Sequence, residues 1–293
     1  MMRRCAAAAV ALVVGLATPA SAQIPGLPTE IASIRHNSGE SVTPYFEGWI
    51  RNADGTFDMV FGYFNRNYVQ EFSIPAGPDN FVEAPSPTGG PPSIDRGQPS
   101  YFLPRRQRYV YRVRVPADAA KREVVWSVTA NGHTERAYGS LIPAEEITER
   151  VVITNGNYDP GLNDPNKPPS IAIAPLQTVA VGTPVTLTAL VTDDGLPKPR
   201  KPPALVEPKG GTSGFGGQIN STTGTQPQGL TVTWLQYSGP AKVAFSHTGV
   251  IQVADGKAVT RATFTTPGTY KLVAAATDPG RLTTRTEIVV SVR

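Results

Sequence analysis

The sequence predicts an all-β protein of two β-sandwich-like domains, joined by a linker rich in Pro, Asn and Asp. Apolar and polar residues alternate over many short runs, as strands with one buried face require. The 293 residues include 28 glycines and 29 prolines, which disfavours a helical bundle or an α/β enzyme. The stretch 157–169 (NYDPGLNDPNKPP) offers no apolar period for a strand or helix, so it divides the chain.

The first 22 residues are predicted to be a secretory signal. Met1–Arg4 is a short basic region, Ala6–Leu16 is an apolar core, and Ala20–Ala22 is a small-x-small cleavage site. The apolar core is too short to cross a membrane. The only cysteine, Cys5, precedes this core, whereas a lipid-anchoring cysteine would follow it. We therefore expect export to the periplasm or the cell exterior, with no transmembrane segment in the mature chain that begins at Gln23.

Cysteine and charge content exclude several functions. Loss of the signal removes the single cysteine, which excludes disulfides, cysteine catalysis and thiolate metal sites in the mature chain. It also removes Arg3 and Arg4 and leaves 25 basic against 23 acidic residues, so no nucleic-acid partner is indicated. A basic run beside a predicted strand, Arg105 to Arg108, is interpreted as the solvated start of that strand and not as an anion site.

The predicted N-terminal domain spans residues 23–159. Pro44–Arg51 and Phe57–Asn65 are expected to form a β-hairpin, with Gly55 at positive φ in the turn. The second of these strands places four residues on its core face by alternation: Phe57, Met59, Phe61 and Tyr63. Further strands are expected at Val69–Ile74, Arg108–Val115, Glu123–Thr129 and His133–Tyr138. The run 76–100, rich in Pro, Gly and Ser, is expected to be a mobile or functional loop.

The predicted C-terminal domain spans residues 170–293, after a linker at 160–169. Its short apolar runs recur at regular intervals between Gly, Pro and Asp turns, which is typical of an antiparallel β-sandwich. Strands are expected at Ser170–Ala174, Val185–Val191, Leu230–Tyr237, Val243–Phe245, Val250–Val253, Ala258–Thr265, Thr269–Thr277 and Thr284–Val292. An insertion near 195–228 interrupts the pattern and is expected to be poorly ordered.

Several features of the C-terminal half are shared with immunoglobulin-like sandwiches. Trp234 lies where such sandwiches bury an indole, and Pro267–Tyr270 (PGTY) leads into a late strand as a tyrosine corner does. With TDDG at Thr192 and TDPG at Thr277, this half resembles PKD and cadherin-like domains. The mature chain as a whole, with its EGW, FGYFNRN and FLPRRQ stretches, is similar to a group of uncharacterised exported bacterial proteins. The first resemblance implies a sandwich fold and the second implies export; neither implies an activity.

Aromatic residues are dense in the N-terminal half and fall on both faces of the predicted hairpin. One core cannot take them all, so some are expected to form an exposed platform that stacks on sugar rings or grips a partner. The candidate ligand-binding residues are Phe46, Trp49, Phe64 and Tyr68. The alternative is that a second sheet or the neighbouring domain covers them.

A calcium site is the second candidate site. In an immunoglobulin-like sandwich the amino-terminal start and the loops after the second and sixth strands lie at one pole, where their side-chain oxygens converge. The residues so placed are Asn163, Asp164, Asn166, Asp193, Asp194 and Asp278. The resemblance to cadherin-like domains, which bind calcium in that region, implies the same ion. Alternatively these side chains only make turns and the protein has no cofactor.

Three functions stay open. The three histidines lie in no recognisable catalytic or zinc motif. The first hypothesis is therefore a non-enzymatic, exported binding, adhesion or envelope-structural protein, whose partner is an unknown envelope or extracellular protein or glycan. The second is carbohydrate binding through the N-terminal aromatics. The third is a hydrolase with paired carboxylates, for which Glu47, Asp58 and Glu71 are available.

Overall fold

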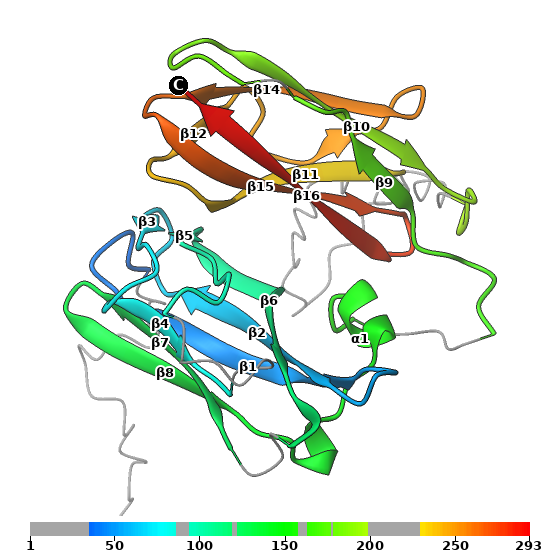
Figure 1. Cartoon of the computed structure of the whole chain (residues 1–293). Coiled ribbons are helices and arrows are strands. Elements are labelled where there is room, and N and C mark those ends of the chain that lie inside the picture. Colours follow the sequence, from blue (N-terminus) through cyan, green and yellow to red (C-terminus); the bar gives the residue numbers. More distant parts are fainter. Residues whose placement is uncertain (1–34, 86–93, 119–121, 158–162, 177, 199–228) are drawn as a thin grey trace, which may run out of the picture. The chain divides into compact units, whose positions relative to one another are not determined.

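The computed structural model describes residues 35–85, 94–118, 122–157, 163–176, 178–198 and 229–293. Regular structure in these residues is almost all β, as predicted (Figure 1). Residues 35–293 form one compact unit with two large, separate hydrophobic cores. The predicted signal at 1–22, part of the linker at 160–169 and most of the insertion at 195–228 lie outside the described residues. Where the chain is described, no helix is long and apolar enough to span a membrane.

The described N-terminal half contains two three-stranded sheets, ordered β1–β2–β6 and β4–β7–β8, and the two-stranded ribbon β3–β5. The strands are β1 (Val42–Arg51), β2 (Phe57–Asn65), β3 (Phe72–Ser73), β4 (Asn80–Glu83), β5 (Tyr101–Phe102), β6 (Arg105–Val115), β7 (Val124–Ala130) and β8 (His133–Gly139). The predicted hairpin is confirmed, because β1 and β2 pair antiparallel with Ile50 opposite Asp58. Gly55 closes the turn with a φ of 83°.

Alternation along β2 builds the N-terminal core. The four residues predicted for its core face are all buried: Phe57, Met59, Phe61 and Tyr63. Trp126 of β7 is fully buried and packs edge-on against Phe61, with 6.0 Å between ring centroids, and against Tyr111 of β6, with 5.4 Å. Side chains of the two sheets therefore meet in one core that is rich in aromatic rings.

A short helical segment covers part of the other face of β2. It consists of the 3₁₀ turn η2 (Pro143–Glu145) and the helix α1 (Glu149–Ile153). Val152 of α1 packs with Ile50 and Val60 in a small cluster of its own. Val60 is therefore fully buried although it points away from the main core, and only the remaining part of this sheet face is left for a ligand.

One expectation for residues 69–100 is wrong, and the run 76–100 contains a strand that was not predicted. The strand predicted at 69–74 is reduced to β3, because Val69 is 65% exposed and its N–H donates to the carbonyl of Asn37, in the segment before β1, instead of to a sheet. The run 76–100 is not structureless, since its described part contains β4. Fully buried Asn80 donates hydrogen bonds from Nδ2 to the carbonyls of Ile74 and Pro99, at 2.9 and 2.8 Å. These bonds tie both ends of the run to the core.

All eight strands predicted for the C-terminal half are present. They form two four-stranded sheets, ordered β12–β14–β10–β9 and β13–β11–β15–β16. Their bounds are β9 (Ser170–Ile173), β10 (Val185–Thr192), β11 (Thr231–Ser238), β12 (Val243–Phe245), β13 (Ile251–Gln252), β14 (Lys257–Phe264), β15 (Gly268–Thr277) and β16 (Thr283–Val292). One core contains buried residues of both sheets, among them Leu187 of β10 and Leu272 of β15, so this half is a β-sandwich.

Two residues confirm the immunoglobulin-like features of this sandwich. Trp234 of β11 is 5% exposed and belongs to the core. Tyr270 of β15 is fully buried, and its hydroxyl donates a hydrogen bond to the carbonyl of Thr266 at 2.8 Å. This bond back to an upstream carbonyl is the tyrosine corner that the PGTY stretch predicts.

Candidate functional site

The outer face of the β1–β2–β6 sheet carries exposed aromatic residues. Because side chains alternate along a strand, Tyr45 and Phe64 point away from the core; Tyr45 is 42% exposed and Phe64 is half-buried. Gly62 lies opposite Tyr45 in the β1–β2 register. A Cβ at Gly62 would lie 2.5 Å from the carbonyl oxygen of Gln107 and would overlap the carboxylate of Glu47. Only glycine therefore leaves room for Glu47 at this position.

Glu47 and Arg106 form an ion pair beside Gly62. Nη2 of Arg106 donates to Oε1 of Glu47 at 2.6 Å, and the Glu47 side chain is 10% exposed. Burial raises the pKa of Glu47 and outweighs the opposing charges of Arg106 and Arg108. The Arg106 guanidinium lies 4.2 Å from the centre of the Tyr45 ring, and its Nη1 is buried without a hydrogen-bond partner.

A second arginine is stacked between aromatic rings at the start of β6. The guanidinium carbon of Arg105 lies 3.9 Å from the ring centre of Tyr68 and 4.7 Å from that of Phe64. Arg105 also donates from Nη1 to the carbonyl of Arg66 at 3.1 Å, and its backbone φ is 67°. Arg35 lies 5.4 Å from the centre of the Tyr68 ring. Such contacts are attractive because the ring face is electronegative.

We name this set the arginine–aromatic face: Arg35, Tyr45, Phe64, Tyr68, Arg105 and Arg106. The interpretation of the run 105–108 as a solvated strand start is wrong for its first two residues, which are half-buried and stacked on rings. The aromatic rings of neighbouring segments attract these guanidinium groups, so both side chains pack on the rings and are only partly solvated. In the sequence, the basic run 105–108 was the only feature that pointed to these two arginines.

The four aromatics proposed as ligand-binding residues are divided by the structure. Phe64 and Tyr68 belong to the arginine–aromatic face, and Tyr68 is 39% exposed. Trp49 lies in the core at 2% exposure and donates its indole N–H to the carbonyl of Ile142 at 2.8 Å. Phe46 is half-buried and packs on Phe61, with 5.3 Å between ring centroids. A second sheet thus covers these two, and Trp49 offers a ligand no surface.

At the junction between the two halves the structure joins two of the proposed calcium ligands directly. Asn166 and Asp278 are 5% and 3% exposed, and Nδ2 of Asn166 donates to Oδ2 of Asp278 at 2.8 Å. The N–H of Leu282 donates to the other carboxylate oxygen of Asp278, also at 2.8 Å. Burial raises the pKa of Asp278, and the charge of Asp193 raises it further.

The other proposed calcium ligands are used mainly in turns. One carboxylate oxygen each of Asp164, Asp193 and Asp194 accepts an N–H two residues further on. Asn163 is exposed. Two oxygens stay buried without a hydrogen-bond partner, Oδ1 of Asn166 and Oδ1 of Asp193. In the described part of the chain no three His, Cys, Asp or Glu residues gather as metal ligands. Any ion held here would have to take amide and carbonyl oxygens together with at most two carboxylates.

Tyr237 at the end of β11 connects the sandwich to the N-terminal half. Its hydroxyl donates to the carbonyl of Gly97 at 2.6 Å, and its own carbonyl accepts the N–H of Ser100 at 3.1 Å. Nearby, Lys242 forms an ion pair with Glu71 at 2.8 Å. The run 76–100, expected to be a mobile or functional loop, thus makes contacts with β11 at its carboxyl end.

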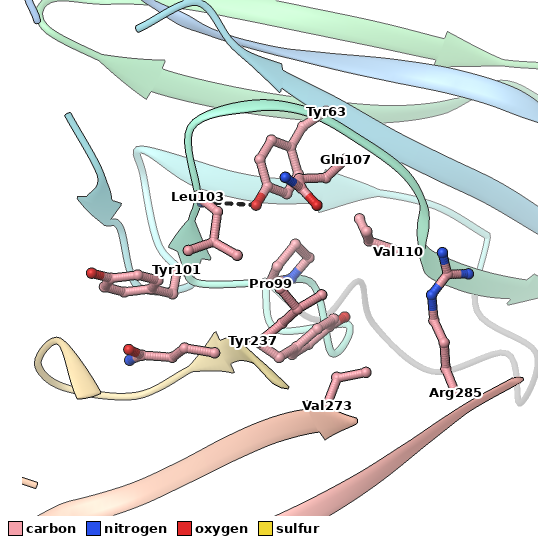
Figure 2. Close-up of a pocket in the computed structure, with 11 residues that line it drawn as sticks. Tyr63, Pro99, Tyr101, Leu103, Gln107, Val110, Tyr237, Val273 and Arg285 are labelled. Atoms are coloured by element: carbon pink, nitrogen blue, oxygen red, sulfur yellow. Dashed lines mark hydrogen bonds between the residues drawn. The ribbon is translucent and has the colours of Figure 1, made fainter. Parts of the chain in front are cut away.

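A small cavity lies beside Tyr237. Figure 2 shows it between Tyr63, Pro99, Val110 and Val273, and its volume is about 40 Å³. Ligand pockets commonly have roughly 300 Å³ or more, so this cavity is a gap in packing. A more open cleft of about 590 Å³ adjoins it, and Arg285 lines both. Burial lowers the pKa of Arg285, as expected for a cation with few partners.

The three carboxylates considered for hydrolysis are engaged by other groups. Asp58 accepts Nε of Arg114 at 2.9 Å, and Glu71 accepts the Tyr101 hydroxyl and pairs with Lys242. Burial raises the pKa of Glu47, as a general acid needs. The charged groups that act on it are Arg106 and Arg108. Among the described residues, the charged groups that act on Glu47 are thus basic, whereas hydrolysis by this route uses a second carboxylate beside the first.

No protein-family model and no curated protein sequence matches the chain. Solved structures resemble it weakly. The D00-D0 domain of intimin is 12% identical with a TM-score of 0.25, and the match covers 85% of this chain and 99% of that one. Fibronectin(III)-like modules of Clostridium thermocellum CbhA are 10% identical with a TM-score of 0.25, covering 86% and 94%. The Yersinia pseudotuberculosis adhesin InvE is 11% identical with a TM-score of 0.24, covering 86% and 59%. Scores this low carry no argument about function.

Proposed function

We propose that the chain is an exported, non-enzymatic protein that binds an envelope or extracellular partner through the arginine–aromatic face. The observation that carries the proposal is this face, where Tyr45 is 42% and Tyr68 is 39% exposed and guanidinium groups stack on both rings. Aromatic residues and arginine dominate the energetics of protein binding surfaces. Residues held on paired strands and by mutual stacking also lose little entropy when a partner binds.

Two features support the rest of the proposal. The predicted signal at 1–22 supports export to the periplasm or the cell exterior. A non-enzymatic role is supported by the carboxylates of the N-terminal half, because Asp58 and Glu71 are held by basic groups and the charged groups that act on Glu47 within the described residues are arginines.

Among possible partners a glycan is the second, more specific candidate. Phe64 and Tyr68, two of the aromatics proposed for carbohydrate binding, lie on the same face as arginines that can hydrogen-bond hydroxyl or carboxylate groups. A protein partner would use the same residues. Glycan-array screening of residues 23–293 separates the two classes, since a protein-binding surface gives no glycan signal.

Calcium at the junction is proposed as a structural ion. The support is the pair of buried oxygens without partners, Oδ1 of Asn166 and Oδ1 of Asp193, beside the buried carboxylate of Asp278. A buried polar atom without a partner costs free energy, and a bound cation would supply the missing interaction. By binding these oxygens, the ion would hold the linker residue Asn166 against the loop after β15.

Proximity labelling in the native cell envelope tests the proposed function. Wild type is compared with the double substitution Tyr45→Ala and Tyr68→Ala and, as a matched control, with Tyr138→Ala, a tyrosine of β8 that is 58% exposed. The double substitution is expected to lose the labelled envelope or extracellular components, and the control is expected to keep them. Equal labelling by all three proteins, or labelling of a substrate-processing pathway, would contradict the proposal.

A further inference from the structure

Two arginines of the arginine–aromatic face have no anionic partner in the part of the chain that the structure describes. Within the described residues no carboxylate lies within ion-pair distance of Arg35 or Arg105, while Glu40 pairs with Arg66 at 3.6 Å and Glu47 is taken by Arg106. Arg106 is already paired with Glu47, and its Nη1 is buried, so that atom is not open to a ligand. The cationic N–H donors that the described residues leave without an anion are therefore those of Arg35 and Arg105.

Guanidinium groups already cover part of the ring faces of Tyr45 and Tyr68, and this favours a charged ligand over a neutral one. A neutral sugar binds an aromatic residue by stacking on a bare ring face. Here Arg105 lies 3.9 Å and Arg35 5.4 Å from the centre of the Tyr68 ring, and Arg106 lies 4.2 Å from that of Tyr45. A guanidinium over a ring still has N–H groups in its own plane, and these match a carboxylate in pairs. The geometry favours recognition of anions.

The side chain of Arg105 is held in place before any ligand binds. Phe64 and Tyr68 both contact its guanidinium, and Nη1 donates to a backbone carbonyl at 3.1 Å. Its backbone φ of 67° lies in the left-handed region, which is uncommon for arginine. Strained backbone of this kind clusters at ligand sites, where the surroundings maintain it. A fixed guanidinium also loses less entropy when an anion binds.

We propose that the arginine–aromatic face binds an acidic polysaccharide, a chain of uronic-acid sugars. The inference rests on the proposed function, because it names the chemical class of partner for the same surface. A polyuronate carries one carboxylate on each sugar ring, with C–H groups between successive carboxylates. Its carboxylates match the guanidinium groups of Arg35 and Arg105, and its C–H groups match the exposed parts of Tyr45, Phe64 and Tyr68.

Titration calorimetry of the mature chain, residues 23–293, tests the ligand class. The probes are polygalacturonate and its carboxyl-reduced, neutral form. Arg105→Asn removes the guanidinium with a residue that tolerates positive φ, and Arg261→Gln is the control, since Arg261 is an exposed arginine of β14. We expect wild type and Arg261→Gln to bind polygalacturonate equally, and Arg105→Asn to bind about tenfold more weakly. Binding of wild type should weaken between about 50 and about 300 mM NaCl, and the neutral polymer should not bind.

Each other outcome contradicts the anion site, the polysaccharide as its ligand, or the proposed function. Equal binding of the neutral polymer, or unchanged affinity of Arg105→Asn with an intact circular dichroism spectrum, overturns the anion site. Binding to phosphatidylglycerol vesicles but not to polygalacturonate assigns the face to a lipid surface and overturns the polysaccharide. If wild type binds no polygalacturonate while the double tyrosine substitution still loses its envelope partners, the ligand class is wrong and the proposed function stands. If the substitutions change neither polygalacturonate binding nor proximity labelling, the ligand class and the proposed function are both wrong.

Discussion

The carboxylate of Glu47 and the guanidinium of Arg106 meet at 2.6 Å on the outer face of the β1–β2–β6 sheet. They meet over Gly62, whose missing side chain leaves the space that the Glu47 carboxylate fills. Arg106 then reaches the ring of Tyr45 at 4.2 Å. A glycine in β2 thus positions a charged pair and, through it, one end of the arginine–aromatic face.

Gly62→Ala is expected to destabilise the fold by about 1–3 kcal/mol, the usual cost of forcing an extra methyl group into a packed site. The added Cβ would lie 2.5 Å from the backbone carbonyl oxygen of Gln107, which cannot move without disturbing β6. Gly77→Ala is the control, because the nearest atom to its added Cβ is 3.8 Å away. Urea unfolding of both variants measures the difference. Equal midpoints would show that the sheet opens to accept the methyl group.

Protonation of Glu47 is expected to make the folded state more stable as the pH falls. Burial raises its folded-state pKa above the ordinary value of 4.5, so the folded state takes up the proton at a higher pH than the unfolded chain does. The gain begins as the pH falls through the raised pKa and is complete below about 4.5.

Glu47→Gln removes this titration and provides the comparison. The free energy of unfolding of wild type, minus that of the variant, should increase between about pH 7.5 and about pH 5. Urea unfolding at several pH values measures it. A difference that stays constant over this range and decreases below about pH 4.5 would mean that the charge of Arg106 outweighs burial and holds the pKa of Glu47 below its ordinary value.

The tyrosine corner provides a stability prediction for the sandwich. Tyr270→Phe removes the hydroxyl that donates to the Thr266 carbonyl at 2.8 Å and leaves the ring in place. The expected cost is about 1 kcal/mol, the net value of one buried hydrogen bond. Tyr138→Phe is the matched control, because Tyr138 is 58% exposed. Thermal unfolding followed by circular dichroism compares the two, and equal losses of stability would show that the corner bond contributes nothing.

The sequence was sufficient to predict the strands with a clear two-residue period. Each of the eight C-terminal strands, the hairpin of β1 and β2, and the burial of Trp234 and Tyr270 follow from alternation and turn residues. The short strands β4 and β5 could not be found in this way. Asn80 anchors β4 by accepting the indole N–H of Trp126 at 3.0 Å, and a buried polar residue gives no signal in a hydrophobic pattern.

The candidate site was predictable only in part. Alternation places Phe64 away from the core, but nothing local to Phe46 or Trp49 indicates that other segments cover them. Arg105 is more than thirty residues from Tyr68 in the sequence, and they meet because β6 pairs with β2. Such stacking depends on cross-strand register, which a single sequence does not specify where the ladder is irregular.

The last prediction concerns calcium at the junction. Ca²⁺ takes amide and carboxylate oxygens, and Oδ1 of Asn166 and Oδ1 of Asp193 are buried beside Asp278 without hydrogen-bond partners. If they hold the ion with the affinity of extracellular modules, a dissociation constant on the order of 0.1 to 1 mM is expected. A tenfold excess of calcium over that constant would stabilise the folded state by about 1.4 kcal/mol.

The measurement is the melting temperature of residues 23–293 with millimolar calcium and with chelator. Wild type should melt roughly 3–6 °C higher with calcium, as a change of this size in free energy implies. The double substitution Asp193→Ala and Asp278→Ala should lose the shift, because it removes both carboxylates from the site. Asp79→Asn, at an exposed aspartate of the N-terminal half, should keep it. Coincident wild-type curves would mean that Asp193 and Asp278 serve only as turn and hydrogen-bond acceptors, and that the hydrogen bond from Asn166 to Asp278 holds the linker without a metal ion.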